Sequence, residues 1–187
     1  MIEPTLDWEQ VAREAKEIAD AHGWNAPPED DATHAVNVLC ELFEAWQLYR
    51  AGHEVDEPIT CEGAGCQMRE VCKERCEQYK PYGIAVELAD AVLRVLSRTG
   101  ELRGPMRIFR AMKAVDKRGE HFYTGELEDL ILYTADEVNG QPDYGVEYAA
   151  RSIIFWCWEH GIPIEDAIRQ KMEYNRKRPW RHGGKRV

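Results

Sequence analysis

The stretch GIAVELADAVLRVL, residues 83–96, decides the fold, because an almost wholly apolar segment here carries two closely spaced carboxylates. Its charged residues are Glu87, Asp90 and Arg94, and the others are Gly, Ile, Ala, Val and Leu. Residues three apart lie on one face of an α-helix, so Glu87 and Asp90 point the same way. Burying two ionised carboxylates costs on the order of several kcal/mol unless a cation or strong donors offset it. We therefore expect a buried helix that carries an acidic site.

A second carboxylate pair with the same spacing lies upstream, in NVLCELFEAWQLYR (residues 37–50), and consists of Glu41 and Glu44. This pair alone is also typical of a solvated helix face beside an apolar stripe, here formed by Leu39, Leu42, Phe43 and Trp46. Four carboxylates with no soft ligand beside them favour Mg²⁺ or Mn²⁺ over zinc or copper. Together the two pairs predict a site for a hard cation, with the ligands Glu41, Glu44, Glu87 and Asp90.

Helical periodicity runs through nearly the whole chain. A Gly follows three of the segments, Pro163 suits the first turn of the last one, and Thr124 is a candidate cap for the fifth. No alternating strand pattern with hairpin turns is found. Helices are expected at about 8–22, 31–50, 83–98, 108–115, 127–134, 144–160 and 163–177.

The fold class expected is all-α, a helical bundle with metal ligands projecting inward from facing helices. The length of 187 residues fits one domain, residues 1–187. Within it, residues 55–82 form a cysteine-rich insert between the two carboxylate helices. Residues 100–160 add further helices. Cys40 and Cys157 lie in apolar helices and are expected in the core.

Composition and charge exclude several classes of protein. Hydrophobic residues make up 44% and charged residues 31%, and no apolar run is long enough to cross a membrane. The N-terminal MIEPTLDWEQ lacks the features of a signal peptide, so we expect a cytoplasmic protein. The net charge is −10, which makes general binding to nucleic acid unfavourable.

Positive charge gathers at the C-terminal end, where the last twelve residues, RKRPWRHGGKRV, contain six Lys or Arg and no acid. The rest of the chain has 18 basic and 34 acidic residues, or −16. Lys171, Asn175 and Arg178 recur at i, i+4 and i+7, so one helical face can present them to phosphates or to the carboxylates. A solvated stripe and a disordered tail remain the alternatives.

The order of these motifs resembles that of the MazG-like all-α nucleoside triphosphate pyrophosphohydrolases. They are Glu41-x-x-Glu44, Glu87-x-x-Asp90 and Lys171-x-x-x-Asn175, and the ending KMEYNRKRPWRHGGKR is similar to that of short members of the group. The resemblance covers about residues 34–100 and 161–186. The helices of residues 100–160, which lie outside it, would shape the base pocket or an oligomer.

The resemblance implies Mg²⁺-dependent (or Mn²⁺-dependent) hydrolysis of a nucleoside or deoxynucleoside triphosphate between the α and β phosphates. The four carboxylates would hold the ions, and one of them, such as Glu41, would activate the attacking water. The phosphates would be bound by Lys171, Asn175, Arg178, His182 and Lys185. The resemblance also implies a homodimer or homotetramer. Trp24 and Trp46 are candidates to stack on the base, although core packing is the more common use of tryptophan at helical spacing.

Four cysteines lie within sixteen residues of the insert with the spacing C-x4-C-x5-C-x3-C: Cys61, Cys66, Cys72 and Cys76. The resemblance does not require them. In a reducing cytoplasm such a group favours a closed structural Zn²⁺ site over disulfides, with an iron–sulfur cluster as the next alternative and free thiols as the third.

Two other classes of function compete with hydrolysis. A di-iron carboxylate bundle uses Glu-x-x-His motifs, and the nearest substitute here is Asp31-x-x-His34. A zinc-stabilised interaction module without catalysis would use the cysteine insert, but it would leave Glu87 and Asp90 unexplained.

Overall fold

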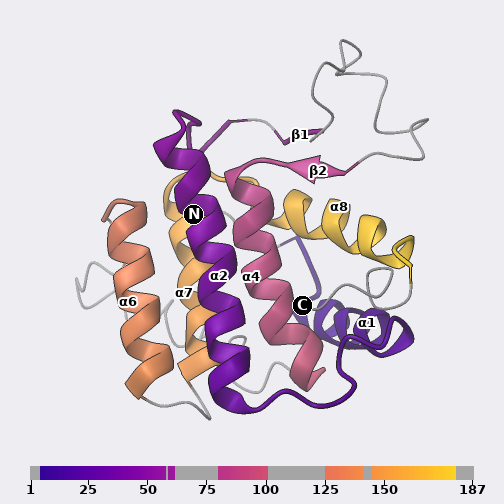
Figure 1. The fold of residues 1–187 in the computed structure, drawn as a ribbon. Coiled ribbons are helices and arrows are strands. Elements are labelled where there is room, and N and C mark those ends of the chain that lie inside the picture. Colours follow the sequence, from indigo (N-terminus) through magenta and orange to yellow (C-terminus); the bar gives the residue numbers. More distant parts are fainter. Residues whose placement is uncertain (1–4, 58, 62–79, 101–124, 141–144, 180–187) are drawn as a thin grey trace.

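The computed structural model describes residues 5–57, 59–61, 80–100, 125–140 and 145–179. These residues form six helices and one two-stranded pair (Figure 1). The helices are α1 (Trp8–Ala21), α2 (Asp31–Arg50), α4 (Ile84–Thr99), α6 (Leu127–Gly140), α7 (Gly145–Glu159) and α8 (Ile164–Arg176).

The first two helices begin at aspartate caps. The carboxylate of Asp7 accepts hydrogen bonds from the backbone N–H groups of Glu9 and Gln10, and the carboxylate of Asp30 accepts one from that of Thr33. Each cap satisfies N–H groups that have no partner within the first turn of a helix. The Asp30 cap fixes the point at which the linker between these helices ends, and this linker forms one end of the cavity described below.

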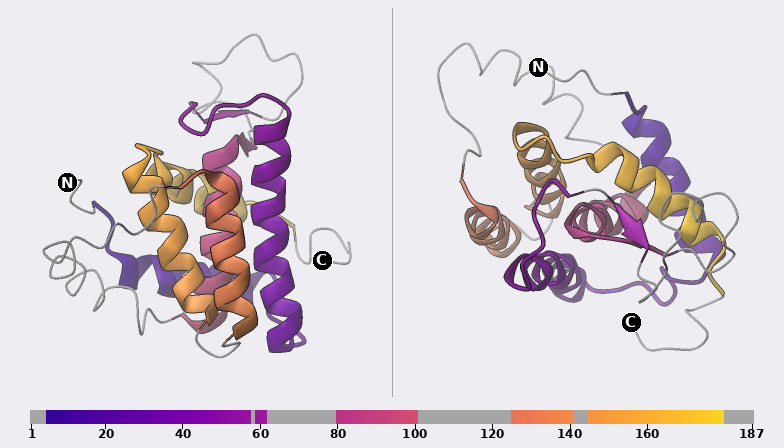
Figure 2. Two further views of the ribbon diagram at one scale, coloured as in Figure 1. Left: turned by 90° about the vertical axis from the view of Figure 1, so that its left-hand side faces the viewer. Right: turned by 90° about the horizontal axis from the view of Figure 1, so that it is seen from above.

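Helix α4 lies at the centre of the bundle (Figure 2). It packs against α1, α2, α7 and α8, and ten of its sixteen residues are buried. Gly100 ends the helix in the left-handed conformation (φ 66°), and a Cβ atom there would lie 2.6 Å from Cδ of Lys16. A glycine is needed at this position because it has no side chain to strain the backbone or to meet α1.

The other helices surround α4. Helices α2 and α4 lie side by side, α6 packs on α7 and α2, and α8 crosses over α4 near α1 (Figure 1). This arrangement confirms the all-α expectation. It also shows that α6 and α7, from the region 100–160, extend the bundle on the side of α4 away from α1 and α8 (Figure 2).

Several local expectations were wrong. Two short strands, β1 (Thr60–Cys61) and β2 (Pro81–Tyr82), pair antiparallel, so the ends of the cysteine insert are hydrogen-bonded to each other just before α4. Two residues per strand are too few to produce an alternating pattern. Pro163 lies at the N-cap position, one residue before the start of α8, instead of in its first turn, and it makes no side-chain cap hydrogen bond.

The expected core position of Cys40 is also wrong. Cys157 is buried, but Cys40 is exposed, as are Val36 and Phe43 on the same side of α2. Phe43 therefore does not belong to the buried stripe of that helix. The expected helix at 108–115 and the Thr124 cap lie outside the described residues. No helix in the described part of the chain is both long and apolar enough to cross a membrane.

Candidate functional site

A cavity of about 600 Å³ lies between α1, α2, α4 and α8. Polar side chains reach it from one stripe of each helix. In α4 they recur at i, i+3, i+7, i+10 and i+11, so they share one face of an otherwise buried helix. The stripe consists of Glu87, Asp90, Arg94, Ser97 and Arg98.

Three carboxylates from two facing helices converge at one end of this cavity. Glu41 and Glu44 come from α2, and Glu87 comes from α4. One oxygen of each lies within 4.8 Å of the others. Glu41 is buried, Glu87 is half-buried and Glu44 is exposed, so the group extends from the interior to the surface.

Asp90 lies one turn after Glu87 and forms an ion pair with Lys171 of α8. Both groups are largely buried, with side chains 17% and 5% exposed. Burial disfavours the ammonium form of Lys171, but the Asp90 and Glu87 carboxylates raise its pKa above the ordinary value. The lysine therefore stays charged and compensates part of the acidic group.

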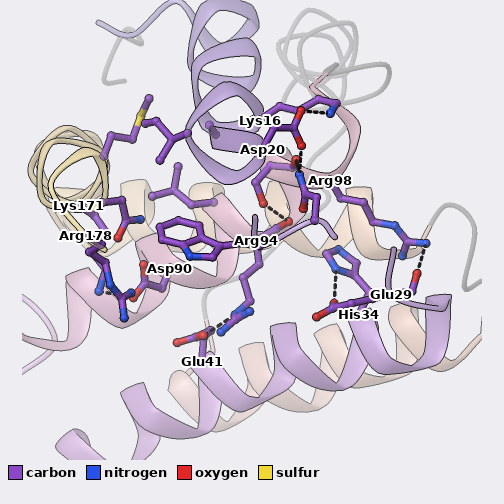
Figure 3. Close-up of a pocket in the computed structure, with 18 of the residues that line it drawn as sticks. Lys16, Asp20, Glu29, His34, Glu41, Asp90, Arg94, Arg98, Lys171 and Arg178 are labelled. Carbon is purple, nitrogen blue, oxygen red and sulfur yellow. Dashed lines mark hydrogen bonds and ion pairs between the residues drawn. The ribbon is translucent and has the colours of Figure 1, made fainter. Parts of the chain in front are cut away.

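Arg94 supplies a second cation to the acidic group. Its Nε donates a hydrogen bond to Oε1 of Glu41 at 2.5 Å, across the space between α4 and α2 (Figure 3). Burial alone would lower the pKa of Arg94, and the Glu41 and Asp90 carboxylates raise it instead. The guanidinium is thus a permanent charge beside the innermost carboxylate.

Two of the carboxylates, those of Glu87 and Glu41, are less acidic than in water. Burial, followed by the charge of Asp90, raises the pKa of Glu87 to about 7. Burial also raises the pKa of Glu41, although Arg94 acts in the opposite direction. Anionic groups packed this closely favour a cation or a proton, and perturbed carboxylates in a cavity are a common feature of functional sites.

The other end of the cavity is formed by the α1–α2 linker and the start of α2. It is lined by Trp24, Asn25 and His34. The amide of Asn25 donates to Oδ1 of Asp20 at 2.7 Å and to the carbonyl of Ser97 at 3.0 Å, so its position is held. Burial, with a contribution from Arg98, lowers the pKa of His34, which makes the neutral imidazole the main form at pH 7.

The chemistry of the acidic end fits a hard divalent cation. Its donors are carboxylate oxygens, and the group of three contains neither a thiol nor an imidazole. Such a set is suitable for Mg²⁺ or Mn²⁺, which prefer oxygen ligands. His34 is not part of it, so the described residues do not form the mixed carboxylate–histidine site of a di-iron bundle.

The structure brings most of the predicted site residues to one cavity. Glu41, Glu44 and Glu87 form the acidic group, and Asp90 lies beside it in contact with Lys171. Asn175 and Arg178 also line the cavity. Oδ1 of Asn175 is buried and has no hydrogen-bond partner among the described residues.

Some predicted site residues cannot be placed. His182 and Lys185 lie outside the described residues, as do Cys66, Cys72 and Cys76. Cys61 belongs to β1, but its side chain is not described.

The two tryptophans that were candidates for stacking on a base lie in different places. Trp24 lines the cavity, with the Arg178 guanidinium 5.5 Å from its ring centroid. Trp46 packs against the core and stacks on Tyr49, and it is not among the residues that line the cavity.

Sequence reasoning missed Arg94, His34 and Asn25 as cavity residues. Arg94 could have been found, because it follows Asp90 by four residues and Glu87 by seven on one helical face. For Asn25 and His34 no local signal exists, since their position depends on how the α1–α2 linker folds over α4. The region 100–160 was expected to shape either a base pocket or an oligomer, and no described residue of α6 or α7 lines the cavity.

Comparisons of the chain with protein-family models, with curated proteins and with solved structures find no match.

Proposed function

We propose that this protein hydrolyses nucleoside or deoxynucleoside triphosphates between the α and β phosphates and releases a monophosphate and pyrophosphate. The observation that carries the proposal is the convergence of Glu41, Glu44 and Glu87 in a cavity that also contains Lys171 and Arg178. The acidic group suits a hard cation, and the two basic residues suit the phosphates that such a cation accompanies. The order of the motifs, similar to that of the MazG-like enzymes, supports the same reaction.

The size and two ends of the cavity support a nucleotide as the ligand. About 600 Å³ lies within the range typical of small-molecule sites. Triphosphate oxygens belong at the carboxylate end, beside Lys171 and Arg178. The base belongs at the end lined by Trp24, Asn25 and His34, which offers a ring to stack on and polar atoms that can form hydrogen bonds.

Each residue has a distinct task in this reaction. The cation-binding residues are Glu41, Glu44, Glu87 and Asp90; bound Mg²⁺ or Mn²⁺ would supply charge neutralisation on the phosphate oxygens. Glu41 orients a water molecule and accepts its proton, a task for which a raised carboxylate pKa is suitable. The water oxygen forms a bond to the α phosphorus, and the bond from that phosphorus to the bridging oxygen breaks. Pyrophosphate leaves with the bonding electron pair, next to Lys171 and Arg178.

Product analysis with labelled water tests the proposal. The purified protein is incubated with a panel of ribo- and deoxyribonucleoside triphosphates and Mg²⁺ in H₂¹⁸O, and products are followed by phosphorus NMR. We expect monophosphate and pyrophosphate, with ¹⁸O in the monophosphate. Orthophosphate as the primary product, or no cleavage of any triphosphate, would contradict the proposal.

A matched pair of variants assigns the activity to this cavity. Glu87→Gln removes a carboxylate from the acidic group, whereas Glu173→Gln removes an exposed one on α8 that pairs with Lys177. Activity should be lost in the first variant and retained in the second. Equal loss in both would mean that the cavity is not the site of cleavage.

We also propose that Cys61, Cys66, Cys72 and Cys76 bind one structural metal, with Zn²⁺ preferred over an iron–sulfur cluster. The β1–β2 pair joins the two ends of this insert next to α4. A metal bound by the insert would therefore help to fix the position of α2 relative to α4. Metal analysis of anaerobically purified protein distinguishes about one zinc per chain from iron with acid-labile sulfide. Neither metal, with all four thiols free, would contradict the proposal.

A homodimer or homotetramer is a further part of the proposal. It is supported by exposed apolar side chains on neighbouring helices, Val36 and Phe43 of α2 and Leu132 of α6, which are 56%, 49% and 69% exposed. Sedimentation of the wild type and of Phe43→Glu measures the assembly state.

A further inference from the structure

Arg94 occupies a position in the cavity that the proposed reaction has not yet used. Its side chain starts on α4 and ends beside Glu41 of α2, with His34 and Glu29 on the side away from Asp90 and Lys171 (Figure 3). The side chain is 32% exposed and lines the cavity. It therefore lies between the carboxylate end and the linker end.

The contact with Glu41 uses one part of the guanidinium and leaves the rest available. Nε donates to Glu41, while Nη1 and Nη2 make no hydrogen bond within the part of the chain that the structure describes. A guanidinium has five N–H donors in a fixed plane, so four of them remain for another acceptor. In a partly buried site such donors favour an anionic partner.

Three other cations that line the cavity are already engaged by acidic residues, whereas the Arg178 guanidinium lies over the rings of Trp24 and Tyr174. Lys171 pairs with Asp90, and Lys16 pairs with Asp20. Arg98, one turn after Arg94 on the same helix, pairs with Asp31 and donates to the carbonyl of Glu29. Arg94 differs from Arg98 because it lines the cavity while its terminal nitrogens have no acceptor among the described residues.

We infer that Arg94 binds the phosphate oxygens of the ligand through Nη1 and Nη2 while its Nε holds the Glu41 carboxylate. A planar guanidinium can satisfy a carboxylate with one edge and a phosphate with another, which a lysine cannot do. Arg94 thus sets the distance between the group that activates water and the phosphate that is attacked. The identity of the ligand as a triphosphate rests on the proposed function, but binding of a phosphate anion does not require cleavage.

The test measures binding without the reaction. Inorganic tripolyphosphate is titrated with Mg²⁺ into the wild type, Arg94→Lys and Arg94→Gln by calorimetry, with Arg98→Lys as the matched control. Loss of a charge-assisted phosphate contact should weaken tripolyphosphate binding about tenfold or more in both Arg94 variants. Arg98→Lys should bind within about twofold of the wild type, because its guanidinium faces protein acceptors.

A second titration distinguishes two roles of Arg94: binding of the phosphate and positioning of Glu41. Mn²⁺ alone is titrated into the wild type and Arg94→Lys. Since Lys keeps the positive charge beside Glu41, Mn²⁺ affinity should change by less than about threefold while tripolyphosphate affinity falls. Circular dichroism and thermal melting confirm that each variant is folded. If Arg94→Lys is not folded, Arg94→Gln carries the tripolyphosphate comparison with Arg98→Lys, and the Mn²⁺ titration is left out.

The outcomes distinguish this inference from the proposed function. Tripolyphosphate binding that depends on Arg94, without cleavage of any nucleoside triphosphate, would support the inference and contradict the function. Cleavage of a nucleoside triphosphate, with unchanged tripolyphosphate affinity in both Arg94 variants, would support the proposed function and contradict the inference. Equal weakening in Arg94→Lys and Arg98→Lys, or no tripolyphosphate binding by the wild type, would overturn the inference.

Discussion

Helix α4 has two sides that bury polar groups in different ways. On the side of α6 and α7, two polar side chains donate to protein acceptors: Ser152 donates to Glu137 at 3.0 Å, and the Trp156 indole donates to the carbonyl of Gly125 at 2.8 Å. On the side of α1, α2 and α8, the acidic side chains converge on a cavity. Both sides contain an acid whose pKa is raised by burial, Glu137 and Glu87. Burial of a carboxylate alone therefore does not indicate a site; burial beside a cavity and other carboxylates does.

The largest expected effect is on catalysis. Glu87→Gln and Asp90→Asn should each lower kcat/KM for triphosphate cleavage by more than about a hundredfold, since even residues that only support a metal ligand contribute about 10–100-fold. Glu137→Gln, the matched change on the other side of α4, should retain activity within about twofold. Steady-state kinetics at saturating Mg²⁺ make this comparison. Similar losses of kcat/KM in Glu87→Gln and Glu137→Gln would show that the cavity side of α4 is not the special site of catalysis.

The next effect is on stability and compares two lysines of α8. Lys171→Met should lower the free energy of unfolding by about 3 kcal/mol, because it leaves Asp90 buried without its cation. Lys177→Met should change it by less than about 1 kcal/mol, because the Lys177–Glu173 pair is exposed, at 69% and 66%. Urea unfolding at pH 8 in a chelator gives both values. Indistinguishable midpoints for the two variants would show that the Asp90–Lys171 pair contributes little.

The smallest effect is the pH dependence of stability that Glu87 introduces. Its pKa is about 7 in the folded protein and 4.5 as the ordinary value, so between these pH values the folded state binds more protons than the unfolded state. Glu87 therefore destabilises the fold above pH 7, and the penalty disappears as the pH falls toward 4.5. Glu87→Gln should raise the free energy of unfolding by at most about 3 kcal/mol at pH 8 in a chelator.

Unfolding at pH 8 and at pH 5 checks this sign. The gain from Glu87→Gln should be larger at pH 8 and small at pH 5, and Glu173→Gln, an exposed acid on α8, should show no such gain. A stabilisation that is equal at both pH values would have another cause than the ionisation of Glu87.

The sequence by itself determined the helices and the acidic stripes on them. Periodicity, the Asp7 and Asp30 caps and Gly100 act within one or two turns, so they are visible in short segments. The spacing of Glu41 with Glu44 and of Glu87 with Asp90 is equally local. For this reason five of the seven helices expected from the sequence match described helices to within one residue at each end. The helix expected at 127–134 continues to Gly140 as α6, and the seventh lies outside the described residues.

Only the tertiary structure decided which side chains meet. Arg94 reaches Glu41 across 53 positions of the sequence, Asp90 pairs with Lys171, and the α1–α2 linker adds Asn25 and His34 to the cavity. Cys40 is exposed although its helix is apolar. These outcomes depend on the rotation of each helix about its axis and on the neighbour it packs against. Both are set by the summed packing of the whole bundle, which no local pattern of residues contains.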